Sequence, residues 1–157
     1  MSPRTLLVTD YTFPSLEHEQ EAARETGLRL DARQLRTEAE VAGAAGTALA
    51  VLVQFAPFGQ AACAALPGPG VIVRYGVGYD NIDVEAARRF GHRVCYVPDY
   101  CTAEVADHTV AMLLSVLRKI PQLDARVRRG EWKAVATMAP APAFGSQTLG
   151  FLGFGRI

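Results

Sequence analysis

Short runs of apolar residues recur along the first two thirds of the chain, and more polar, helix-favouring segments separate them. Each run is continuous rather than alternating, which is typical of strands buried in a parallel sheet with both faces covered. The pattern predicts strands over residues 5–10, 28–35, 48–55, 71–75 and 93–97, and helices over residues 15–26, 37–45, 61–66 and 84–90. We therefore expect an α/β fold, with an open, doubly wound parallel sheet over residues 1–98.

Small polar residues and glycines predict where these helices begin and end. Ser15 and Asp83 can cap the first and fourth helices, and Gly27 and Gly91 stand just past their ends. The second helix is expected to be broken near Gly43 and Gly46.

A second region, residues 99–157, follows Pro98 and begins with a long predicted helix. Thr102 can cap this helix, and residues 105–120 are apolar almost all the way round, which is typical of a helix packed between two domains or subunits. Residues 122–132 predict a further helix with a solvated basic face, and residues 138–146 an irregular connector. A strand from Leu149 into a glycine turn would then start a second, unfinished α/β unit.

Composition excludes several classes of protein. The sequence of 157 residues has 16 basic and 16 acidic residues, so it offers no overall attraction for nucleic acid or an anionic membrane. Its three cysteines form no paired motif, which argues against a disulfide framework or a metal site. No apolar run approaches membrane-spanning length. We expect a cytoplasmic protein without a membrane segment.

Two glycine motifs could carry chemistry. Gly76-Val77-Gly78 follows a predicted strand, where successive backbone amides can face a carboxylate and Arg74 can add a bidentate contact. An ordinary tight turn beside a surface arginine explains the same residues. Gly153 and Gly155 are spaced as in a turn that binds a pyrophosphate at a helix amino terminus.

The remaining polar residues suggest structural roles. Asp107 and His108 are helix neighbours and point about 100° apart, so they are poorly placed as an acid/base pair. His18 and His92 are expected at the surface, and Cys101 is expected to be a free thiol.

Three segments, 71–83 (VIVRYGVGYDNID), 94–108 (VCYVPDYCTAEVADH) and 149–157 (LGFLGFGRI), together resemble the D-isomer-specific 2-hydroxyacid dehydrogenase family. Within it the phosphoglycerate-dehydrogenase-like and C-terminal-binding-protein-like branch is most similar. The resemblance implies a flavodoxin-like substrate domain over residues 1–98, and a hinge helix with the truncated start of an NAD-binding Rossmann domain over residues 99–157. It implies that the substrate carboxylate is bound by Arg74, Val77 and Gly78. It also implies a cofactor site that includes Val77, Thr102, Val105, Gly153, Gly155, Arg156 and Ile157.

The resemblance further implies hydride transfer between a nicotinamide and C2 of a small 2-hydroxy or 2-oxo acid. The choice between NAD and NADP stays open. The family's catalytic Arg, Glu and His are expected outside these residues, so we expect no catalytic residue in this chain and a fragment that is inactive alone. A homodimer is expected for the complete protein. An NAD-sensing, corepressor-like or carboxylate-binding interaction protein is the alternative function.

Overall fold

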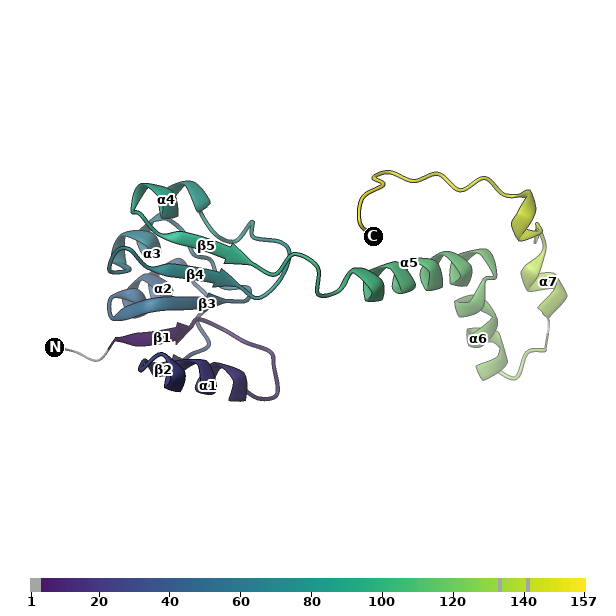
Figure 1. The fold of residues 1–157 in the computed structure, drawn as a ribbon. Helices are drawn as coiled ribbons and strands as arrows, with labels where there is room; N and C mark the ends of the chain where they lie inside the picture. The colour runs from purple at the N-terminus through teal and green to yellow at the C-terminus, as the bar shows by residue number, and fades with distance from the viewer. Residues whose placement is uncertain (1–3, 133, 141) are drawn as a thin grey trace. The chain divides into compact units, whose positions relative to one another are not determined.

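The computed structural model describes residues 4–132, 134–140 and 142–157, and it divides into two compact units, Met1–Tyr100 and Cys101–Ile157. The first unit contains a five-stranded parallel sheet in the order β2-β1-β3-β4-β5 (Figure 1). Its strands are β1 (Thr5–Val8), β2 (Arg29–Ala32), β3 (Ala48–Val53), β4 (Val71–Arg74) and β5 (Arg93–Tyr96). This is the flavodoxin-like strand order, so the predicted fold class is confirmed.

Helices alternate with these strands as predicted. They are α1 (Glu17–Glu25), α2 (Glu38–Ala45), α3 (Gln60–Ala65) and α4 (Val84–Arg89). The expected break at Gly43 is wrong, because α2 runs through that residue to Ala45, but the helix does end at Gly46, its C-cap. A glycine inside a helix costs only about 1 kcal/mol relative to alanine. The buried side chains of Val41 and Ala44 offset that cost by packing α2 onto the sheet.

The ends of the helices follow from local hydrogen bonds. Asp83 caps α4 and accepts a hydrogen bond from the Ala86 amide, as predicted. Gly27 and Gly91 adopt positive φ angles of 67° and 77° just past α1 and α4. Ser15 does not occupy the N-cap position of α1, which is Leu16, although its Oγ accepts a hydrogen bond from the Glu17 amide at 3.2 Å.

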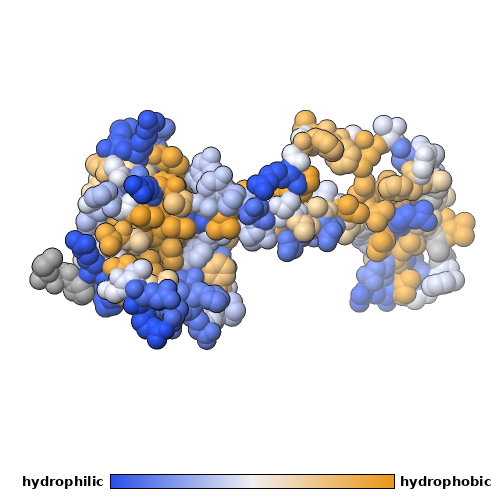
Figure 2. Space-filling view, in the orientation of Figure 1, coloured by the Kyte–Doolittle hydropathy of each residue, from blue (hydrophilic) through white to orange (hydrophobic). Residues whose placement is uncertain are grey.

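The core lies between the sheet and the three helices α2, α3 and α4, which are stacked along it (Figure 1). Val51, Ile72 and Phe58 are completely buried there. Right-handed crossovers place α1 on the opposite face. Within the first unit no helix covers that face over β3 to β5, and there Leu52 and Val73 are half-buried and Cys95 is exposed. Figure 2 shows this area as a hydrophobic surface between the hydrophilic surfaces of α1 and α4. By the helices of the first unit alone, the expectation of two covered faces is therefore only half met.

The second unit consists of α5 (Thr102–Leu117), α6 (Ile120–Arg128), α7 (Ala134–Met138) and a 3₁₀ turn at Phe144–Ser146. Thr102 does not cap α5 but is its first residue, and Cys101 occupies the N-cap position. No residue of α5 is buried. The predicted strand at Leu149 is not formed, and residues 149–157 are irregular. A parallel strand requires a neighbouring strand to satisfy its backbone hydrogen bonds, and the described residues of this unit contain none.

Candidate functional site

The carboxyl ends of the strands bring together segments that are far apart in the sequence. Asp10 follows β1, residues 54–56 follow β3, and the Gly76-Val77-Gly78 loop follows β4. The chain changes direction in the sheet between β1 and β3, because β2 lies on one side of β1 and β3 on the other. Ligands of open α/β sheets bind at the carboxyl ends near such a switch point. This edge is therefore the candidate site.

Asp10 organises the loop after β3. Its carboxylate accepts hydrogen bonds from the backbone amides of Gln54, Phe55 and Ala56 at 3.1, 2.7 and 3.1 Å. The Thr9 hydroxyl donates a fourth hydrogen bond at 2.8 Å. The Asp10 side chain is thus buried but well satisfied. The sequence placed Asp10 at the end of a strand without revealing its three backbone partners, which lie more than 40 residues away in the chain.

Arg74 is the last residue of β4, and its side chain lies along this edge. Its Nε atom is buried and has no hydrogen-bond partner among the described residues. The guanidinium carbon lies 5.7 Å from the centroid of the Phe55 ring, a cation–π distance. A guanidinium in this state is a donor without an acceptor. It suits an anionic ligand that could complete its hydrogen bonds.

The glycine loop presents backbone donors beside Arg74. The Gly76 carbonyl accepts a hydrogen bond from the Val97 amide at 3.3 Å, which ties the loop to the segment after β5. Val77 and Gly78 are exposed, and within the described part of the chain their amides donate to no protein acceptor. A Cβ atom at residue 78 would lie 3.3 Å from the Asp80 carboxylate, a tight contact. The structure places the Arg74 guanidinium against Gly76, the first residue of the loop that carries Val77 and Gly78.

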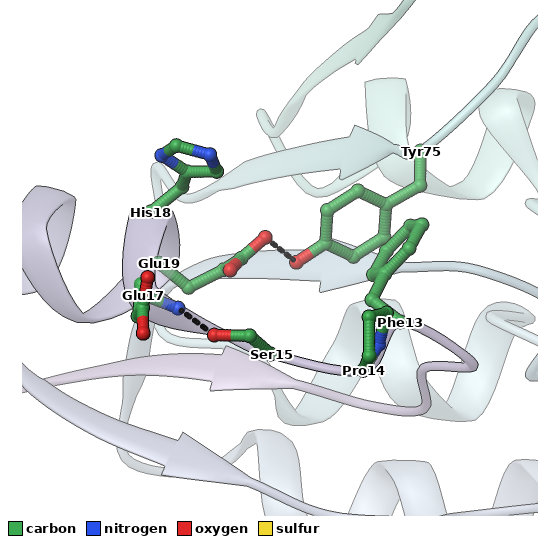
Figure 3. Close-up of a pocket in the computed structure, with 7 residues that line it drawn as sticks. All are labelled: Phe13, Pro14, Ser15, Glu17, His18, Glu19 and Tyr75. Carbon is green, nitrogen blue, oxygen red and sulfur yellow. Dashed lines mark hydrogen bonds between the residues drawn. The ribbon is translucent and has the colours of Figure 1, made fainter.

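A pocket of about 390 Å³ lies between α1 and the end of β4 (Figure 3). The Tyr75 hydroxyl donates a 2.9 Å hydrogen bond to Glu19, and the Tyr75 ring packs edge-on against Phe13 at 5.1 Å. Burial, and secondly the hydrogen bond to Glu19, raise the pKa of Tyr75 above its ordinary value. The phenol is therefore a permanent donor at physiological pH. Sequence reasoning missed this pair because its members are 56 residues apart.

The predicted cofactor residues lie mostly in the second unit. Thr102 and Val105 share the first turn of α5, and Val105 is 39% exposed. Gly153 has a φ angle of 89°. A Cβ atom added to Gly153 or to Gly155 would have no neighbouring atom within 4 Å. Arg156 and Ile157 complete the same irregular segment. A dinucleotide-binding turn needs a strand before it and a helix after it, so residues 149–157 do not form a nucleotide site by themselves.

Two histidines differ in their surroundings. His92 was expected at the surface but is buried: its Nδ1 accepts the Gly70 amide at 3.1 Å, and its Nε2 lies 2.9 Å from the Cys63 carbonyl. These partners require a neutral ring with the proton on Nε2. His18, Asp107 and His108 are all exposed. Among the residues described, no cluster of three His, Cys, Asp or Glu side chains could hold a metal.

Comparison with known proteins identifies the family. The family model for the catalytic domain of D-isomer specific 2-hydroxyacid dehydrogenases matches residues 6–150. The chain belongs to this family. The glyoxylate reductase of Thermococcus litoralis is 45% identical over 92 residues, a match covering 55% of this chain and 28% of that protein. The D-3-phosphoglycerate dehydrogenase of Methanocaldococcus jannaschii is 45% identical over 87 residues, covering 55% of this chain and 16% of the relative.

Solved structures agree on the fold. The D-lactate dehydrogenase of Aquifex aeolicus, solved with NAD and lactic acid, superimposes with a TM-score of 0.71 at 23% identity, covering 82% of this chain and 38% of the other. A Thermus thermophilus protein, TT0316, gives a TM-score of 0.67 at 32% identity, and the match covers 82% of this chain and 42% of that protein. The matches span less than half the length of these proteins. No helix among the residues described is both long and apolar enough to cross a membrane.

Proposed function

We propose that this chain contributes the substrate-binding part of an NAD-dependent dehydrogenase acting on the CH–OH group of a small 2-hydroxy acid, or on the matching 2-oxo acid. Residues 1–98 serve as the substrate domain. Residues 99–157 serve as the hinge helix and the beginning of the NAD-binding domain. Family membership supports the reaction class. The observation that carries the substrate assignment is the buried, unpartnered Nε atom of Arg74 beside the free amides of Val77 and Gly78, among the residues described.

The carboxylate is the part of the substrate that these residues recognise. Arg74 supplies positive charge and hydrogen bonds of fixed direction, and the amides of Val77 and Gly78 supply two donors without bulky neighbours. A carboxylate held at several points leaves C2 and its oxygen in one orientation. Stereospecific chemistry at C2 requires such an orientation. The loop thus positions the substrate, and we propose no catalytic role for it.

The cofactor is proposed from the family alone. NAD is the first choice because the Aquifex aeolicus structure was solved with NAD. An acyclic imino acid reductase of similar fold, with a TM-score of 0.72 at 20% identity, was solved with NADPH, so NADP stays open. Val77, Thr102, Val105 and residues 153–157 are the proposed cofactor-facing positions.

The exposed apolar residues of α5 support the hinge-helix assignment. Val110, Met112 and Val116 are 53%, 57% and 71% exposed. Exposure of this many large apolar side chains on one helix is typical of a surface covered by another domain or subunit. We propose that a homodimer covers it in the complete protein. The three free cysteines are compatible with a reducing, cytoplasmic environment.

Pyruvate binding to this chain tests the substrate assignment, with neutral pyruvamide as the matched compound. Amide NMR spectra should show saturable shifts at Val77, Gly78 and the Arg74 Nε–H with pyruvate only. Replacing Arg74→Gln should weaken pyruvate binding at least about tenfold, equivalent to about 1.4 kcal/mol. Arg93→Gln is the control, because Arg93 is exposed and pairs with Val71 at the opposite end of the two strands. Unchanged affinity in Arg74→Gln would contradict the assignment.

The oxidoreductase activity needs its own measurement. A complete protein containing this chain should oxidise NADH in the presence of a short 2-oxo acid faster than the uncatalysed reaction. Carboxylate binding without any such turnover would favour the alternative function, a corepressor-like or carboxylate-binding interaction protein.

A further inference from the structure

Asp10 is connected to Arg74 through a single residue, Phe55. The Asp10 Oδ2 atom accepts the Phe55 amide at 2.7 Å, and the Phe55 ring lies 5.7 Å from the guanidinium carbon of Arg74. We propose that Asp10 is a positioning residue for substrate binding: it fixes the loop after β3 so that Phe55 holds Arg74 ready for the carboxylate. This inference rests on the proposed function, because it takes the carboxylate as the ligand.

The hydrogen bonds of Asp10 restrict the loop along three consecutive residues. The amides of Gln54, Phe55 and Ala56 all converge on one carboxylate. Hydrogen bonds to an ionised acceptor are stronger than neutral ones, and rotation of this loop would break several at once. Asp10 therefore sets the direction in which the Phe55 side chain projects from the backbone.

Packing does not set the position of the Phe55 ring. The side chain is 64% exposed, so the hydrophobic core offers it little support. Its described ring contact is the Arg74 guanidinium. The backbone geometry that Asp10 imposes is consequently what keeps the ring over the arginine.

Arg74 needs such support because no carboxylate of the described residues forms an ion pair with it. A long side chain without a partner samples several rotamers, and ordering it on binding costs affinity. An aromatic face restricts the guanidinium without occupying its in-plane N–H donors. The contact with Phe55 thus pre-organises Arg74 and leaves its donors available to a ligand.

Replacing Asp10→Asn provides the first test. Asparagine keeps the size of the side chain but removes the charge and turns one acceptor into a donor that faces backbone N–H groups. We expect the dissociation constant for pyruvate to rise about tenfold. Nuclear Overhauser contacts between the Phe55 ring and the Arg74 Cδ protons, measured without ligand, should weaken. Asp31→Asn is the matched control, since Asp31 pairs with Arg33 on the edge strand β2.

Phe55→Leu tests the same connection from its other end. It removes the ring and keeps the Asp10 hydrogen bonds, which use only backbone atoms of residue 55. We expect a similar rise in the dissociation constant. If Asp10 acts through Phe55, the double variant Asp10→Asn/Phe55→Leu should bind pyruvate no more weakly than Phe55→Leu alone.

Each outcome decides the proposal. Wild-type pyruvate affinity in Asp10→Asn would overturn it. So would a double variant whose dissociation constant for pyruvate rises by the product of the two single-variant factors. Should Asp10→Asn fail to fold, Phe55→Leu decides alone, and unchanged pyruvate affinity there would overturn it. If the wild-type protein binds no pyruvate at residues 77 and 78, the proposed function fails. The Phe55–Arg74 contacts in Asp10→Asn then still decide whether Asp10 positions them.

Discussion

The Nη1 atom of Arg74 lies where a Cβ atom on residue 76 would project, so Gly76 is the residue that makes room for the arginine. The atom that such a Cβ would displace, Nη1 of Arg74, is at the end of a flexible side chain. We therefore expect Gly76→Ala to lower the free energy of unfolding by less than about 1 kcal/mol. It should nevertheless move the guanidinium and weaken pyruvate binding about tenfold. Denaturant unfolding and NMR titration measure the two effects separately.

Gly43→Ala is the control for this substitution. Gly43 lies inside α2, and a Cβ atom there would have no neighbour within 4 Å. Alanine should stabilise the protein by about 0.5–1 kcal/mol and leave pyruvate binding unchanged. Unaltered pyruvate affinity in Gly76→Ala would show that binding does not depend on the place Arg74 occupies beside the loop.

His92 joins two segments of the core through its ring nitrogens. His92→Ala would leave the Gly70 amide and the Cys63 carbonyl without partners and would open a cavity. We expect the free energy of unfolding to fall by about 2–4 kcal/mol. His18→Ala should change it by less than about 0.5 kcal/mol, because His18 is exposed. Equal effects of the two substitutions would argue against the buried, doubly bonded ring.

Tyr75 should make stability depend on alkaline pH. Its folded-state pKa is raised, first by burial and then by the hydrogen bond to Glu19, above the ordinary value of 10.0. The stabilising contribution is complete below pH 10.0, and it declines as pH rises because the unfolded state releases its proton first. Urea unfolding across this range should show a smaller decline for Tyr75→Phe. A decline of the same size in both proteins would assign it to other groups.

Cys63 and Cys95 should differ in reactivity. Burial raises the pKa of Cys63 to about 11, so little thiolate forms at neutral pH, and its side chain is also inaccessible. Cys95 is exposed on β5. A thiol-specific reagent followed by peptide mapping should label Cys95 in the folded protein and Cys63 only in denaturant. Rapid labelling of Cys63 without denaturant would indicate that the core between α3 and α4 opens readily.

The local pattern was sufficient to predict the elements of the first unit. Continuous apolar runs and the breakers between them located the five strands and four helices, because these signals lie within a few residues of one another. The same reasoning failed at Leu149. An apolar run before a glycine turn has the composition of a strand, but strand formation depends on hydrogen bonds to a neighbour that composition does not reveal.

The sequence likewise predicted only part of the candidate site. The sequence predicted Arg74, Val77 and Gly78 as neighbours because they are close in the chain. It could not predict that Asp10 binds the loop after β3, that Phe55 lies over Arg74, or that Tyr75 binds Glu19. Each of these contacts joins residues from different strands or helices, so no local spacing encodes it.

By itself, therefore, the sequence determined an α/β chain, the places where its strands end in glycine loops, and its resemblance to a dehydrogenase family. Only the tertiary structure decided that His92 is buried, that no helix of the first unit covers one sheet face over β3 to β5, and that a carboxylate more than 40 residues away holds the loop after β3. The physical reason is that propensity and periodicity act over a few neighbouring residues. Burial and hydrogen-bond pairing depend on which distant segments the parallel sheet brings to the same edge.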